Sequence, residues 1–235
     1  MSKNIKIEIL FPEFCNLFGD ISNIKYLKKC LPEAEFIETD YNSEPKFMNE
    51  DINFIYLGPM TEKMQEKVIK KLMPLKNKIK EMIESDVQFL VTGNAIEIFG
   101  KYIENEDGSK IEALGVFDIY SKRDMLHRNN SIFIGNWNDI KIVGFKSQFT
   151  YLYGNNENDY FAKVEKGIGL NKESKLEGIQ EHNFIGTNLI GPILILNPKL
   201  TKKIIENLGI ENPKIAFEED LENAYEQRLS EFEKI

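Results

Sequence analysis

Short apolar runs alternate with segments of helical spacing through the first hundred residues of the chain. Residues 5–11 alternate apolar and polar side chains, which is typical of a strand. Residues 52–57 form an apolar run that ends at a Gly-Pro pair, and residues 87–91 form another. Residues 34–37 are a shorter candidate. These runs predict the strands of one sheet.

Helical patterns fill the intervals between these strands. Asp20 can cap a helix whose apolar positions over residues 24–31 have helical spacing. A longer pattern covers residues 64–83, and Pro74 should kink or divide it. Strands and helices in this order predict a mostly parallel sheet covered by helices, an α/β fold.

The rest of the chain predicts additions to this core. Residues 115–162 are rich in β-branched and aromatic residues and short turns, which indicates antiparallel additions to the same sheet. Residues 184–189 form a further strand, and Asn197-Pro198, as cap and first helical residue, begin a helix. An apolar stripe over residues 216–235 predicts a C-terminal helix. Because no repeat and no Pro- or Ser-rich linker divides the chain, residues 1–235 are interpreted as one domain.

Composition narrows the possible function classes. The 235 residues include 30 Lys and Arg and 38 Asp and Glu, a net charge of −8. This balance argues against a nucleic-acid binder or an anionic-membrane binder, because phosphate affinity needs clustered cations. No run approaches the ~20 apolar residues of a membrane span. The N-terminus lacks the pattern of a secretory signal, so a cytoplasmic location is expected.

The few cysteines and histidines exclude other classes. Cys15 and Cys30 are too few for a disulfide scaffold or a four-thiolate zinc site. His127 and His182 leave little for a multi-histidine metal centre. We therefore expect no metal and no cofactor.

One turn has the form of a catalytic elbow. Residues 89–94, Phe-Leu-Val-Thr-Gly-Asn, predict a strand that turns sharply into a helix. Such a turn exposes one side chain at the carboxyl end of a sheet and directs helix N–H groups toward it, as for a nucleophile and its oxyanion hole. The exposed residue is predicted to be Thr92. The alternative is an ordinary turn in which Thr92 caps the helix.

Several motifs occur in an order that resembles a known family. They are Phe11-Pro12, Asn16-Leu17-Phe18-Gly19-Asp20 and Asn23-Ile24; Gly58; Val143-Gly144-Phe145; and Glu177-Gly178, Asn183, Ile185-Gly186-Thr187, Leu189, Gly191-Pro192, Leu194 and Asn197-Pro198. The chain resembles the cobyric-acid-synthase-type class I glutamine amidotransferases. Within them it is most similar to the glutaminase subunits of lipid II isoglutaminyl synthases, which partner a Mur-ligase-like protein. The resemblance covers roughly residues 5–208 and implies a flavodoxin-like α/β fold with helices on both faces of the sheet.

The chain departs from these motifs where the family carries its chemistry. The family has Cys-Gly-Gly-Tyr-Gln-Leu-Leu-Gly at the elbow, with the Cys as nucleophile; this chain has Thr92 followed by residues 93–100, one residue longer. The family's catalytic His is replaced by Ile190. A threonine hydroxyl needs a base within hydrogen-bond reach, and Ile190 cannot accept a proton. Loss of such a pair typically lowers the rate by roughly 10³–10⁶-fold, so the resemblance implies a scaffold without glutaminase activity.

No other residue is expected to restore the pair. His182 precedes the strand that leads to Ile190, which places it near the opposite end of the sheet. His127 lies in a basic segment and is expected on the surface. Pro59, after the second apolar strand, also removes a backbone N–H donor from a turn where the family has glycines.

Binding chemistry is retained at the elbow. Its N–H groups and the following helix dipole form an anion-binding corner. The candidate ligand-binding residues are Gly58, Gly93, Asn94, Gln148 and Asn188. The alternative is that these groups satisfy the backbones of their own turns. Glu97 is either a carboxylate in the pocket or a solvated helix residue.

These observations favour a subunit that binds a small amide or anion and a partner, such as a Mur-ligase-like or other synthetase subunit. Two other classes stay open. The protein could be an active enzyme, either a glutaminase with relocated residues or a hydrolase or transferase that uses Thr92 and Glu97. It could also be a purely structural subunit.

Overall fold

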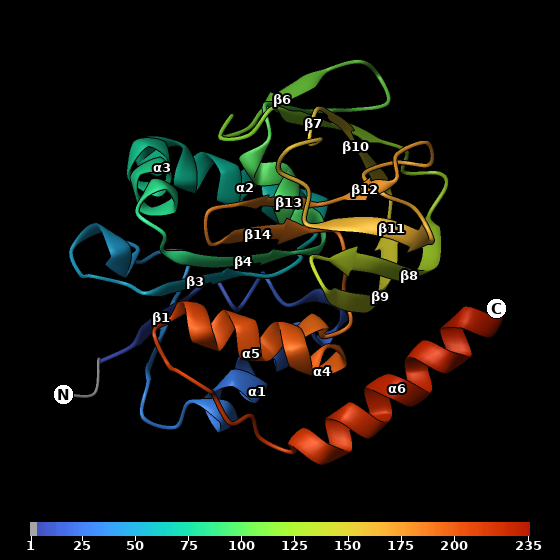
Figure 1. Ribbon diagram of the computed structural model, residues 1–235. Helices are drawn as coiled ribbons and strands as arrows, with labels where there is room; N and C mark the ends of the chain where they lie inside the picture. Colours follow the sequence, from blue (N-terminus) through green and yellow to red (C-terminus); the bar gives the residue numbers. More distant parts are fainter. Residues whose placement is uncertain (1–3) are drawn as a thin grey trace.

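The computed structural model describes residues 4–235 and is organised around a six-stranded sheet (Figure 1). The strand order is β13-β14-β4-β3-β1-β2, with β13 antiparallel to β14 and the other neighbours parallel. This mostly parallel sheet confirms the predicted α/β fold class. Its strands are β1 Lys6–Leu10, β2 Glu35–Thr39, β3 Phe54–Leu57, β4 Gln88–Thr92, β13 Ile179–Glu181 and β14 Phe184–Thr187.

Helices cover both faces of this sheet. Leu57 and Val91 pack in a core with residues of the helices on one face, whereas their neighbours Tyr56 and Leu90 pack with the helices on the other. This alternation is why both central strands are apolar throughout. One face carries α2 Glu62–Leu72, η3 Met73–Leu75 and α3 Lys76–Glu84; the other carries α1 Ser22–Cys30, α4 Ile193–Leu196 and α5 Pro198–Asn207.

Pro74 divides the long helical pattern as predicted. It lies in η3, a single 3-10 turn between α2 and α3. A proline inside a helix removes a backbone hydrogen bond and clashes with the preceding turn. The chain accommodates it by ending α2 and beginning α3 at once.

The antiparallel segment is not an extension of the main sheet, and this part of the prediction is wrong. The strands of residues 115–162 instead join neighbouring strands in two separate four-stranded sheets, β10-β7-β5-β6 and β12-β11-β8-β9. Within residues 4–235, only β13 adds to the main sheet in the antiparallel sense, and it occupies the edge beside β14. The bounds are β5 Tyr102–Glu104, β6 Lys110–Glu112, β7 Ile119–Arg123, β8 Asn129–Trp137, β9 Ile140–Gln148, β10 Thr150–Gly154, β11 Ala162–Lys166 and β12 Leu176–Glu177.

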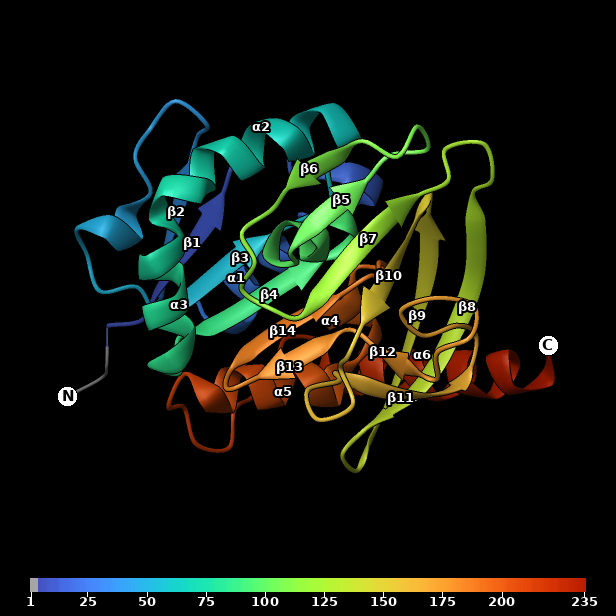
Figure 2. The same cartoon turned by 90° about the horizontal axis from the view of Figure 1, so that it is seen from above.

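The two smaller sheets lie on the side where the parallel strands end (Figures 1 and 2). The β8-β9 hairpin is paired along its whole length, from Asn129 opposite Gln148 to Trp137 opposite Ile140. Its second strand makes a two-way backbone bridge with Ile190, just after β14: Ile190 N donates to Phe145 O at 2.9 Å and Phe145 N to Ile190 O at 3.3 Å. The hairpin therefore forms one wall of the carboxyl edge of the main sheet.

Both predicted cap residues have other roles. The residue that precedes α1 is Ile21 rather than Asp20, and no side chain caps this helix. Asp20 is instead buried beneath the sheet edge, where it accepts hydrogen bonds from Tyr56 and Thr92. Asn197 does precede α5, with Pro198 as the first helical residue, but its side chain accepts from Val143 N at 2.8 Å rather than from the helix. The strand predicted over residues 184–189 ends earlier, at Thr187.

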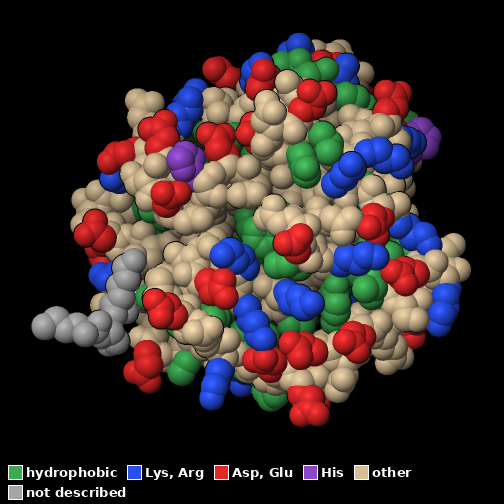
Figure 3. Space-filling view, in the orientation of Figure 1, with side chains coloured by type: hydrophobic (Ala, Val, Ile, Leu, Met, Phe, Trp, Pro, Cys, Tyr) green, Lys and Arg blue, Asp and Glu red, His purple; other side chains and the backbone are tan. Residues whose placement is uncertain are grey.

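The predicted C-terminal helix is α6, Glu218–Lys234. It packs on the β8-β9 hairpin, where the Tyr225 hydroxyl donates to Lys141 O at 2.9 Å and the Phe232 ring lies 5.3 Å from that of Phe145. On the face of the molecule seen in Figure 3, acidic and basic side chains are interspersed. Within residues 4–235, the structure contains no helix with the length and apolar character needed to cross a bilayer.

Candidate functional site

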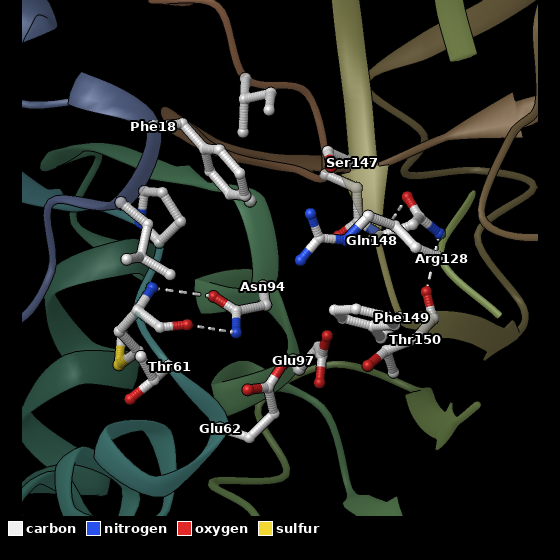
Figure 4. A pocket seen from close by; sticks show the side chains of 16 residues that line it. Phe18, Thr61, Glu62, Asn94, Glu97, Arg128, Ser147, Gln148, Phe149 and Thr150 are labelled. Atoms are coloured by element: carbon white, nitrogen blue, oxygen red, sulfur yellow. Dashed lines mark hydrogen bonds between the residues drawn. The ribbon is translucent and has the colours of Figure 1, made fainter. Parts of the chain in front are cut away.

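A pocket of about 180 Å³ opens at the carboxyl ends of β4 and β14 (Figure 4). Open α/β sheets bind ligands at this edge. Five segments form its walls: the loop before α1, the β3–α2 turn, the elbow after β4, the β8-β9 hairpin with the start of β10, and the end of β14. They contribute Leu17 and Phe18; Pro59 to Glu62; Gly93, Asn94 and Glu97; Arg128 and Ser147 to Thr150; and Asn188 and Ile190.

The elbow predicted after β4 is present, but the side chain of Thr92 turns away from the pocket. Thr92 is completely buried, and its Oγ1 donates to Asp20 Oδ2 at 2.5 Å. It does not cap the following 3-10 helix η4, Gly93–Phe99. The Tyr56 hydroxyl donates to the same carboxylate oxygen. Burial raises the pKa of Asp20, although the Thr92 and Tyr56 hydrogen bonds oppose that rise.

Gly93 is the elbow residue that faces the pocket. Its φ is +57°, in the region that favours glycine. A Cβ at this position would lie 2.6 Å from Pro59 Cβ and 3.5 Å from Ile190 Cγ2. Gly93 is therefore required both by the backbone conformation and by the close approach of Pro59, and Ile190 lies directly beside it.

Asn94 closes the turn between β3 and α2 against the elbow. Its Oδ1 accepts from Met60 N at 3.0 Å, and its Nδ2 donates to Met60 O at 2.7 Å. Both ends of this side chain therefore satisfy backbone groups, as the alternative interpretation expected. Gly58 lies behind this turn, where a Cβ would meet Cys15 O at 2.5 Å. It does not contribute to the pocket lining.

Gln148 and Asn188 lie together on the wall formed by β9 and the end of β14. Gln148 Nε2 donates to Thr150 O at 2.7 Å, and Asn188 Nδ2 donates to Gln148 Oε1 at 3.4 Å. Asn188 is 4% exposed, and its Oδ1 has no hydrogen-bond partner. This oxygen is one of the few buried polar atoms without a partner, and such atoms need an explanation.

A buried ion pair fixes the position of Asn188. Lys146 contacts Glu177, and both side chains are completely buried. Glu177 Oε1 accepts from Asn188 N at 2.9 Å and from Thr187 Oγ1 at 2.8 Å. Lys146 Nζ also donates to Gly169 O at 2.6 Å. Burial lowers the pKa of Lys146, while the Glu177 carboxylate opposes this effect.

Glu97 is a pocket carboxylate and not a solvated helix residue. It is 2% exposed, and its Oε2 accepts from Gln65 Nε2 at 3.0 Å. Gln65 Oε1 in turn accepts from Arg123 at 2.9 Å, so Gln65 lies between the Arg123 guanidinium and the Glu97 carboxylate. Burial raises the pKa of Glu97 to about 7, because desolvation of the carboxylate outweighs the Gln65 and Arg123 interactions. Glu97 therefore titrates near neutral pH.

Arg128 is a site residue that sequence reasoning missed. It enters the pocket from the segment before β8, and its guanidinium lies 4.4 Å from the centre of the Phe149 ring (Figure 4). Stacking on an aromatic face orients an arginine side chain. Its one signal in the sequence is the basic character of residues 122–128, which by itself predicts a surface loop.

The chain's thiols and imidazoles lie elsewhere among the described residues. His182 is at the opposite end of the sheet, with its Nδ1 3.1 Å from Asp86, and His127 is exposed beside Asp124. Cys15 is buried, with its sulfur 3.9 Å from Met60, and burial raises the pKa of its thiol well above the ordinary value. Residues 4–235 also hold no cluster of three or more His, Cys, Asp or Glu side chains suited to a metal ion.

Known proteins are similar to this chain in sequence. The chain matches the CobB/CobQ-like glutamine amidotransferase domain over residues 6–196. It is 31% identical over 207 residues to the GatD subunit of the glutamine-hydrolysing lipid II isoglutaminyl synthase of Staphylococcus aureus, covering 86% of this chain and 83% of that protein. The GatD subunit from Streptococcus pneumoniae is 26% identical over 212 residues, covering 86% of this chain and 79% of that protein.

Solved structures share the fold at low sequence identity. A crystal structure of a glutamine amidotransferase has a TM-score of 0.52 at 10% identity, covering 86% of this chain and 99% of that chain. A glutamine amidotransferase from Thermotoga maritima has a TM-score of 0.53 at 12% identity, covering 96% and 93%. The family that the sequence motifs predicted is thus confirmed. The chain belongs to the family of CobB/CobQ-like glutamine amidotransferase domains.

Proposed function

We propose that this chain is a glutamine amidotransferase-family subunit that has lost glutamine hydrolysis and kept its pocket for binding a ligand. The observation that carries the proposal is the pair at the elbow: Gly93 faces the pocket and Ile190 lies beside it. No thiol or imidazole is among the residues that line this pocket. Hydrolysis of an amide by this family's route needs a nucleophile and a proton acceptor there.

Backbone geometry supports Gly93, rather than Thr92, as the position that corresponds to the family nucleophile. An elbow holds its nucleophile on a sharp, strained turn, and Gly93 is the residue here with positive φ. The family motif of eight residues, from Cys to the final Gly, then matches Gly93 to Gly100 with no insertion. In this register Glu97 occupies the position of the family's Gln.

The surroundings of Gly93 also oppose the reaction. Pro59 occupies the space that a side chain at position 93 would need, and it has no N–H to offer an oxyanion. Thr92 cannot substitute, because its hydroxyl is directed to the buried Asp20 carboxylate and lies outside the pocket lining. A missing oxyanion donor alone costs roughly 10²–10³-fold in rate.

Similarity to subunits supports a partner. Both curated relatives are named as subunits of a glutamine-hydrolysing lipid II isoglutaminyl synthase. The partner we propose for this chain is a synthetase subunit of the Mur-ligase-like class. The ligand would be a small polar molecule, because a pocket of about 180 Å³ holds little more and charged and amide side chains are among its lining residues.

Ammonia release from glutamine tests the proposal. We expect none above background from the purified chain, alone or co-purified with its synthetase partner, in an assay where the Staphylococcus aureus subunit is run in parallel with its own partner. Release that disappears in Thr92→Ala but persists in Glu84→Gln, a change at the exposed end of α3, would establish the active-enzyme alternative.

A further inference from the structure

The residues that line the pocket carry more negative than positive charge. Of the residues that line it, only Glu62, Glu97 and Arg128 carry charge, two carboxylates and one guanidinium. Glu97 is almost completely buried; Gln65 and Thr150 are its side-chain donors, and the Arg123 guanidinium lies behind Gln65. Desolvation still outweighs these partners, so a cation that reached the carboxylate from the pocket would stabilise its charged form. The pocket is therefore matched to a ligand with one net positive charge.

The β8-β9 side of the pocket and the end of β14 offer the complementary groups. Arg128 is held over the Phe149 ring, and it presents N–H donors that suit a carboxylate. Asn188 Oδ1, on the same wall, is a buried acceptor that lacks a donor. An ammonium group is a donor with no acceptor of its own, so it satisfies such an oxygen. This wall thus fits the α-carboxylate and α-ammonium of an amino acid.

From this arrangement, which rests on the proposed function, we infer that the pocket binds a small amino acid with a second ammonium group at the end of its side chain. The α-carboxylate lies on Arg128, the α-ammonium on Asn188, and the terminal ammonium on Glu97. Glu97 is the residue that sets this preference, because a carboxylate favours an ammonium over the uncharged amide of glutamine. The volume of about 180 Å³ accommodates an amino acid of this size.

Ornithine and glutamine form a matched pair for the test, because both are α-amino acids whose side chains end after the same number of carbons, in an ammonium and an amide respectively. Calorimetry on the full chain at about pH 8 keeps Glu97 ionised, above its pKa of about 7. We expect ornithine to bind at least about tenfold more tightly than glutamine, as a charge-assisted hydrogen bond provides. Equal or tighter binding of glutamine overturns the inference.

Three variants separate the roles. Glu97→Gln should remove the ornithine preference and leave glutamine binding within about threefold, whereas Glu84→Gln, which removes one exposed carboxylate, should change neither. Arg128→Gln and Asn188→Ala should weaken both ligands by the same factor, about tenfold each. A preference that persists in Glu97→Gln refutes the assignment. Circular dichroism and thermal unfolding are used to check that each variant is folded.

The two proposals fail in different ways. Ammonia release from glutamine by the wild-type chain defeats the proposed function whatever ornithine does. Absence of both ammonia release and an ornithine preference leaves the proposed function standing and defeats only the ligand inference. Ornithine could also bind without competition from glutamine and with the same affinity in the double variant Arg128→Gln/Glu97→Gln. That result would place ornithine outside this pocket and would also defeat the inference.

Discussion

Replacement of Glu97 by glutamine should stabilise the protein in a pH-dependent manner. Burial raises the pKa of Glu97 from the ordinary value of 4.5 to about 7 in the folded state. The folded state therefore holds a proton more tightly than the unfolded chain does. Stability is lost as pH rises from the unfolded pKa to the folded pKa, and the loss is complete above about pH 8. Glutamine has the same shape and no such titration.

The interval between the two pKa values sets the magnitude. At ~1.36 kcal/mol for each pH unit, it corresponds to about 3 kcal/mol. The residue is 2% exposed, so solvent screening reduces this figure little. The glutamine introduced at position 97 can still accept from Gln65 and can place its amide beside the Thr150 hydroxyl, which also contacts the carboxylate in the wild type. We therefore expect no hydrogen bond to be lost.

Urea unfolding at a series of pH values checks this prediction. The difference in the free energy of unfolding between Glu97→Gln and the wild type should be near zero at about pH 4.5 and rise to about 3 kcal/mol at about pH 8. Asp20, whose pKa burial also raises, is present in both proteins and cancels in the difference. A difference that is constant across the series, or a less stable variant at high pH, refutes the reasoning. Glu84→Gln should show no such slope.

Three further outcomes are expected. Thr92→Cys with Ile190→His should leave glutamine hydrolysis at least about 10²-fold below that of an active family member, because the new thiol points toward the buried carboxylate under the elbow; a rate within about tenfold contradicts this. Thiol-alkylating glutamine analogues should not label Cys15, whose buried thiol has a raised pKa; mass spectrometry that finds stoichiometric labelling, blocked by glutamine, refutes the inactive assignment. Lys146→Met should lower the free energy of unfolding by about 3–5 kcal/mol, since it leaves Glu177 charged and buried. Addition of Glu177→Gln should restore part of that loss in urea unfolding; no recovery contradicts the ion-pair explanation.

The sequence predicted the core of the fold because hydrophobic periodicity records which faces are buried. The apolar runs that became β3 and β4 are buried on both faces, and Pro74 marked the division between α2 and α3. The pairing of the antiparallel strands was not predictable in the same way. Alternation shows that a segment is a strand, but not whether its partner belongs to the main sheet or to a neighbouring hairpin.

The sequence predicted where the pocket lies, at the elbow after β4, but not which side chains face it. The elbow after β4 was found from a strand followed by Thr-Gly-Asn, yet the residue that faces the pocket depends on which of them takes positive φ. Asp20 had the residue type of a cap but lies under the sheet edge, because Tyr56 and Thr92 supply donors there. Arg128 reaches the pocket from a segment 30 or more residues beyond the elbow, so no local spacing indicated it.

Under the proposed function, the contact between Pro59 and Gly93 would make the loss of the nucleophile difficult to reverse by mutation. A side chain at position 93 would lie 2.6 Å from Pro59 Cβ, so a mutation that returns cysteine there is penalised while the proline remains. Replacement of the proline first brings no catalytic gain, because Gly93 and Ile190 still provide neither nucleophile nor base. Neither substitution alone would therefore raise the rate of hydrolysis. Under the proposed function, the pocket could therefore acquire another ligand, whereas hydrolysis would not return through single selected substitutions.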